Sequence, residues 1–84
     1  MTAKLLYPVR VALRVYQAQR YVTWPALRDL VLKEVRLAGM PSIEKPCLKQ
    51  AAERFQQLGR LFTPRDQRWL EARGCAPWPT TKED

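Results

Sequence analysis

The sequence predicts a small, mainly α-helical domain of three helices followed by a short C-terminal element. Two observations carry this prediction. Apolar residues recur at helical spacing in three segments of the 84-residue chain. Proline or a capping residue lies at the start of each segment, and glycine follows the second and the third. A chain of this length makes one domain with a thin stability margin. We place that domain over residues 1–76 and expect a loose tail over 77–84.

The first helix is predicted over residues 8–20, because Pro8 can open it without losing a hydrogen bond. Its apolar positions cover more than half of the circumference, which indicates packing on more than one side. They include Val9, Ala12, Leu13 and Tyr16. The remaining stripe is polar and carries Arg10, Arg14 and Gln17. This stripe is a candidate contact for phosphate or for the acidic residues of a protein partner.

The second helix is predicted to begin after Thr23, a good N-cap residue, with Pro25 in its first turn. Asp29 lies close enough to its N-terminal end to benefit from the helix dipole and is expected to pair with Lys33 at i+4. Gly39 is placed to end the helix in the left-handed conformation.

The third helix is predicted from about Pro46 to Gly59. Its inner face combines small and aromatic residues at i, i+3, i+4, i+7 and i+10, namely Leu48, Ala51, Ala52, Phe55 and Leu58. Its outer face is polar and hydrogen-bonding, with Lys49, Gln50, Glu53, Arg54 and Gln57. A helix built in this way can present its polar side chains to a groove of nucleic acid.

Two structures fit the residues after Gly59. Thr63 is a capping residue followed by Pro64 and, at the third position, Asp66, which predicts a fourth helix over 64–73. The alternative is a short β-hairpin, with strands at 61–63 and 68–70 joined by a turn over 64–67. Local caps favour the helix, whereas the order of elements along the chain favours the hairpin. Trp24, Trp69 and Trp78 are expected in the core or at its edge.

The net charge of +7 favours a polyanionic partner, such as DNA, RNA or an acidic protein. The excess is concentrated at the N-terminus, because residues 1–28 carry +5 and residues 29–59, which include the third helix, carry only +1. No run of eighteen apolar residues is present, so we expect no membrane partner.

The composition predicts neither an enzyme nor a cofactor site. The chain has no histidine, its eight acidic residues are scattered, and its three glycines do not form a phosphate-binding loop. The two cysteines, Cys47 and Cys75, lack the spacing of a metal site. We expect both to be reduced, in a cytoplasmic protein, with a disulfide between them as the alternative.

A helix, a second helix opened by Thr23, a turn, and a third helix that closes with Leu58-Gly59-Arg60-Leu61-Phe62 resemble the winged helix-turn-helix of DNA-binding proteins. The resemblance covers about residues 8–72. The second helix is longer than is usual in that family, and the turn after it contains Pro41 and Pro46.

The resemblance implies that the third helix enters the major groove of duplex DNA and that a β-hairpin forms the wing. Base and phosphate contacts would come from Lys45, Lys49, Gln50, Glu53 and Arg54. The wing would hold phosphates with Arg60, Arg65 and Arg68.

Two functions are therefore expected, in order of preference. The first is a small DNA-binding protein, a transcriptional regulator or a recombination accessory factor, for which a second copy of the chain is a further candidate partner. The second is a non-enzymatic interaction module, of the kind encoded by phages and mobile elements, that binds an acidic host protein through Arg10, Arg14 and Gln17.

Overall fold

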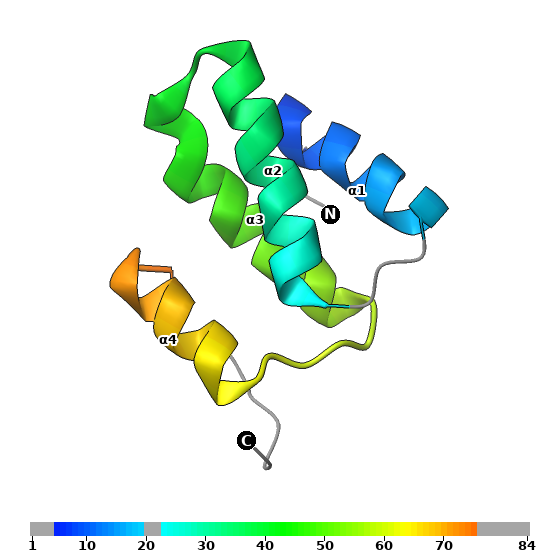
Figure 1. Cartoon of the computed structure of the whole chain (residues 1–84), viewed down its shortest axis with the longest axis vertical. Helices are drawn as coiled ribbons and strands as arrows, with labels where there is room; N and C mark the ends of the chain where they lie inside the picture. The colour runs from blue at the N-terminus through cyan, green and yellow to red at the C-terminus, as the bar shows by residue number, and fades with distance from the viewer. Residues whose placement is uncertain (1–4, 20–22, 76–84) are drawn as a thin grey trace.

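The computed structural model describes residues 5–19 and 23–75, and these residues form four α-helices and one short 3-10 turn. The helices are α1 (Tyr7–Gln19), α2 (Trp24–Ala38), α3 (Glu44–Gln57) and α4 (Pro64–Ala72). The 3-10 turn η1 (Pro41–Ile43) joins α2 to α3. Figure 1 shows α1 and α4 on opposite sides of the α2–α3 pair. The predicted mainly helical fold is confirmed, while the predicted tail over 77–84, with Trp78, lies outside the described residues.

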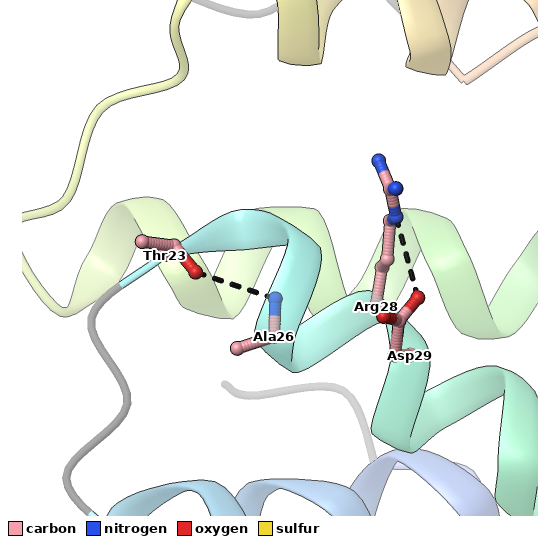
Figure 2. Close-up of polar contacts among 4 residues, drawn as sticks. All are labelled: Thr23, Ala26, Arg28 and Asp29. Carbon is pink, nitrogen blue, oxygen red and sulfur yellow. Dashed lines mark hydrogen bonds and ion pairs between the residues drawn. The ribbon is translucent and has the colours of Figure 1, made fainter.

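The helix ends follow local chemistry. Thr23 has extended backbone angles, and its side-chain oxygen accepts a hydrogen bond from the Ala26 N–H at 3.4 Å (Figure 2). Gly39 adopts a φ of 66°, the left-handed conformation that favours glycine, and ends α2. The predicted caps of α2 are therefore confirmed. Asp29 differs from its prediction, because its Oδ1 lies 3.5 Å from Arg28 Nε rather than next to Lys33 (Figure 2).

Residues 64–72 form α4, so the β-hairpin over 61–70 is wrong and the alternative fourth helix is correct. Thr63 Oγ1 accepts a hydrogen bond from the Asp66 N–H at 3.1 Å, and the Asp66 carboxylate accepts one from the Thr63 N–H at 3.2 Å. This reciprocal capping box satisfies two N–H groups that a helix leaves free at its start. No strand of two or more residues occurs within residues 5–19 and 23–75.

Aromatic packing holds α4 on the α2–α3 pair. Trp24, at the start of α2, is fully buried. The centroid of its ring system lies 5.8 Å from that of Phe55, 5.3 Å from that of Phe62 and 6.2 Å from that of Trp69, each in an edge-to-face arrangement. Trp24 thus links α3, the segment after α3, and α4 in a single core. Its burial, and the partial burial of Trp69, confirm the prediction for these two tryptophans.

Packing against α2 and α3 leaves one side of α1 exposed to solvent. Val9, Ala12, Leu13 and Tyr16 are buried, as the periodicity predicts, and α1 packs mainly against α2. Arg10, Arg14 and Gln17 are exposed. The polar stripe of α1 therefore faces solvent beside α3, and this placement creates the candidate site.

Candidate anion-binding groove between α1 and α3

An open groove of about 540 Å³ lies between the polar stripe of α1 and the C-terminal half of α3. We call it the α1–α3 groove. It is lined by Leu5, Arg10, Leu13, Arg14, Gln17, Arg54, Gln57 and Leu58. Three of these eight residues are arginines and none is acidic. The groove therefore combines positive charge with a partly apolar lining.

Helix geometry sets the spacing of the cations on the α1 side. Arg10 and Arg14 lie four residues apart on α1, so their backbones are about 6 Å apart along the helix axis and both side chains project from the same face. The guanidinium carbon of Arg10 lies 5.8 Å from the centroid of the Tyr7 ring, at the outer limit of a cation–π contact. Arg10 and Arg14 therefore place two cationic side chains along one side of the groove.

Arg54 supplies the third cation from α3. Its Nη1 donates a long hydrogen bond of 3.5 Å to Gln57 Oε1, one turn further along the helix. A guanidinium group has five N–H donors, so this contact leaves most of them available to a ligand. The nearest carboxylate along the sequence, Glu53, is not among the lining residues. Arg54 therefore extends the positive charge of α1 across the groove.

The groove joins two sets of residues that the sequence analysis kept apart. Arg10, Arg14 and Gln17 were expected to bind a partner, and Arg54 was expected to contact DNA from the third helix. Gln57 and Leu58 were not expected at a binding site, although Gln57 belongs to the polar outer face predicted for this helix. Helical periodicity indicates which face of a helix is polar, but not which neighbouring helix lies beside that face.

Gln50 is held by the protein's own chain. Its Oε1 accepts a 2.8 Å hydrogen bond from the Leu6 backbone N–H, and the side chain is partly buried. This bond ties α3 to the residue just before α1. Gln50 is therefore less open to adenine than expected, since one hydrogen bond already engages its acceptor oxygen.

Lys45 and Lys49 lie on the other side of α3, towards the end of α4. The Lys45 ammonium group approaches Gly74, and both lysines are close enough to Cys75 to lower the pKa of its thiol. Burial outweighs this effect, so the pKa of Cys75 is raised overall. A cation near the C-terminal end of a helix also interacts favourably with the helix dipole. Both lysines therefore lie near the C-terminal end of α4.

The solvent-exposed face of α3 is poorly suited to binding phosphate groups. Pro46, Lys49 and Glu53 are all exposed, and their spacing of three and four residues places them on one face. This line combines one proline, one cation and one carboxylate. The Glu53 carboxylate could accept a hydrogen bond from the amino group of cytosine, but it would also repel nearby phosphates.

The three arginines expected on a wing lie elsewhere. Arg60 lies beside Tyr16 of α1, where its charge and hydrogen bonding oppose the burial that raises the pKa of the Tyr16 hydroxyl. Arg65 and Arg68 are exposed on α4 and border a separate hollow of about 310 Å³ with Thr63 and Pro64. The structure therefore divides the expected DNA-binding residues among several surfaces.

Two further arginines, which the sequence analysis did not single out, stack on Trp69. The guanidinium carbon of Arg28 lies 4.5 Å from the ring centroid, and that of Arg73 lies 3.9 Å from it. Both distances fall well within the range of cation–π contacts. The sequence could have indicated the contact with Arg73, which lies four residues after Trp69 on the same helical face. It could not have indicated the contact with Arg28, because that contact depends on how α4 packs on α2.

The described part of the chain holds no group of three histidine, cysteine or acidic side chains that could bind a metal ion. Cys47 and Cys75 are both free thiols and both are buried, so the alternative disulfide between them is wrong. Burial raises the pKa of the Cys47 thiol. In the described residues, no helix has the length and apolar character that a bilayer span requires.

Comparison with family models, with curated proteins and with solved structures found no match for this chain.

Proposed function

We propose that this protein binds duplex DNA through its phosphate backbone and that the α1–α3 groove makes the main contact. The observation that carries the proposal is the convergence of Arg10, Arg14 and Arg54 on one groove whose lining contains no carboxylate. A guanidinium group is suited to phosphate, because its planar fork donates two parallel hydrogen bonds. Phosphate contacts also dominate the affinity of DNA-binding proteins.

The proposed contact differs from the one that the winged-helix resemblance implies. The helix order α1, α2, α3 is the feature of that resemblance which supports DNA binding, but α4 occupies residues 64–72 in place of a wing. Arg65 and Arg68 would then touch phosphates from a helix. On α3, Lys49 and Glu53 remain candidates for base edges. We expect weak sequence preference, because Gln50 Oε1 already accepts a hydrogen bond from the Leu6 backbone N–H.

The salt dependence of affinity tests the proposal. Contacts from Arg10, Arg14, Arg54, Arg65 and Arg68 would give a slope of log K against log salt of about −4 to −5. The double variant Arg10→Ala/Arg14→Ala removes two of these contacts, so its slope should be shallower by about 2. The charge-matched control is Lys33→Ala/Arg36→Ala, in which both side chains are exposed on α2 and neither lines the groove.

The control variant should keep the slope of the unmodified protein. If both double variants reduce the slope equally, net charge rather than the groove governs binding. If the unmodified protein shows a flat and weak response to salt, it does not use duplex DNA as its ligand.

A second candidate is an interaction module for an acidic protein, and the apolar part of the groove favours it. Leu58, which is 43% exposed, lines the groove together with Leu5 and Leu13. An amphipathic helix with leucines and carboxylates would match this mixture. In that case Leu58→Ser would abolish partner binding, whereas phosphate binding would tolerate the loss of a leucine, because the substitution adds no charge to the groove. A role in transcription or recombination would belong to the first candidate only.

A further inference from the structure

The segment that joins α3 to α4 carries an exposed leucine. Leu61 is 53% exposed, whereas its neighbour Phe62 is fully buried. Thr63, the next residue, is exposed again and has extended backbone angles, with φ −78° and ψ 164°. Successive side chains of an extended segment point to opposite sides. Burial of Phe62 therefore turns Leu61 and Thr63 outward, towards the same side.

The side to which Leu61 points is basic. Thr63 lines the hollow of about 310 Å³ at the start of α4, together with Pro64, Arg65 and Arg68. Within residues 5–19 and 23–75, neither of these arginines forms an ion pair. The carboxylate between them in the sequence, that of Asp66, is only 6% exposed and accepts a hydrogen bond from the Thr63 N–H. The exposed leucine thus lies beside two guanidinium groups whose charge is available to a ligand.

The α1–α3 groove lies on the other side of Leu61 along the chain. Leu58 lines that groove and comes three residues before Leu61, and Thr63 lines the α4 hollow two residues after it. Five residue steps span at most about 18 Å, so the two basic surfaces begin within that distance of each other. One turn of duplex DNA is about 34–36 Å long. Both surfaces can therefore contact phosphates of one duplex within about half a turn.

An irregular segment suits the minor groove of DNA better than the major groove. The major groove is about 12 Å wide and admits a whole helix, whereas the minor groove is about 6 Å wide. Residues 60–63 belong to no helix and form no strand of two or more residues. Proteins that bind the minor groove frequently insert an apolar side chain, leucine among them, between two base pairs. An exposed leucine flanked by two basic surfaces matches this arrangement.

We propose that Leu61 enters the minor groove of duplex DNA and separates two stacked base pairs. Arg65 and Arg68 hold the phosphates at one edge of the minor groove, and the α1–α3 groove holds those at the other edge. The inserted side chain kinks the duplex by about 20–90°, the range known for such wedges. This role of Leu61 rests on the proposed binding of duplex DNA, to which it adds the groove that is read and the deformation of the DNA.

Energy transfer between fluorophores on the two ends of a duplex of about 30 base pairs measures the kink. The unmodified chain should raise the transfer efficiency. Leu61→Ala should return it to nearly the value of free DNA, while the slope of log K against log salt stays at about −4 to −5, because no arginine is changed.

The matched control is Leu37→Ala, since Leu37 is 70% exposed on α2 and lines neither basic surface. This variant should keep both the kink and the slope. Because both leucines are exposed, neither substitution should disturb the core.

Base-pair substitution identifies the groove that the protein enters. An inosine–cytosine pair lacks the 2-amino group of guanine, so it resembles an A·T pair in the minor groove but a G·C pair in the major groove. The 2-amino group obstructs the floor of the minor groove. Duplexes of A·T and of inosine–cytosine pairs should therefore bind the unmodified chain about equally, and a few-fold more tightly than a G·C duplex. Leu61→Ala should reduce this preference.

Two results would overturn the role of Leu61. One is binding with the expected salt dependence but without a kink, or with a kink that Leu61→Ala and Leu37→Ala change equally. The other is an inosine–cytosine duplex that binds like G·C rather than like A·T. Either result leaves phosphate binding in the α1–α3 groove intact, whereas a flat response of affinity to salt would refute the proposed function together with this role.

Discussion

Arginines serve different purposes in two regions of this protein. Between α2 and α4, Arg28 and Arg73 stack on Trp69, and Arg28 also lies 3.5 Å from Asp29. In the α1–α3 groove, Arg10, Arg14 and Arg54 share a surface without any carboxylate. The first set stabilises the attachment of a helix, whereas the second keeps its charge available for a ligand. The positive charge of a small domain therefore says little about function until each cation is placed.

The largest expected effect concerns the α2–α4 region. Trp69→Ala removes an edge-to-face contact with Trp24 and both cation–π contacts, so it should lower the free energy of unfolding by about 2–4 kcal/mol. Urea denaturation measures this change. The groove variant Arg14→Ala should change stability by less than about 0.5 kcal/mol, since its side chain is exposed. Equal losses in the two variants would contradict the division of roles.

Alkaline pH should separate the buried region from the groove. Burial raises the pKa values of the Cys47 and Cys75 thiols, so the folded chain holds these protons at pH values where the unfolded chain releases them. Stability is therefore fully present below the ordinary thiol pKa and declines as the pH rises through the raised values. The decline is at most about 1.4 kcal/mol per pH unit for each thiol.

Thermal unfolding of the unmodified chain and of Cys47→Ala, across the alkaline range, measures this decline. The variant should lose less stability with rising pH, because one titrating group is gone. Binding of a polyanion by the folded chain should stay constant over the same range, because arginine does not titrate there. An identical pH dependence in both chains would show that the Cys47 thiol is not the group responsible.

A smaller effect distinguishes two glutamines of α3. Gln50→Ala leaves the Leu6 N–H without its acceptor and should cost about 1 kcal/mol of stability, with little change in the DNA sequence preferred. Gln57→Ala removes only the long contact to Arg54 in the groove and should weaken DNA binding with little loss of stability. Urea denaturation and a binding titration on both variants separate the two roles. A change in sequence preference for Gln50→Ala would restore its assignment as a base-reading residue.

The sequence was sufficient where local chemistry decides the structure. Thr23, Gly39 and the pair Thr63 and Asp66 mark helix ends through contacts within a few residues, and the structure confirms these ends. The choice between hairpin and helix after Gly59 was also local. The capping box determined it, whereas the expectation drawn from the order of elements in a known family was misleading.

The sequence was insufficient where contacts join distant segments. The bond from the Leu6 N–H to Gln50 connects residues 44 positions apart, and nothing in the outer face of α3 indicates it. The same holds for Arg54, which belongs to the third helix by sequence but shares a groove with two arginines of the first. The crossing of α1 and α3 creates the site, and single-helix periodicity carries no information about that crossing.

The side-chain NMR signals of the arginines provide the most direct test of the division between the two regions. A short duplex DNA titrated into labelled protein should shift the Nε–Hε signals of Arg10, Arg14 and Arg54 and leave those of Arg28 and Arg73 in place. Shifts confined to Arg28 and Arg73, or spread equally over all five arginines, would contradict the assignment of the α1–α3 groove as the phosphate-binding surface.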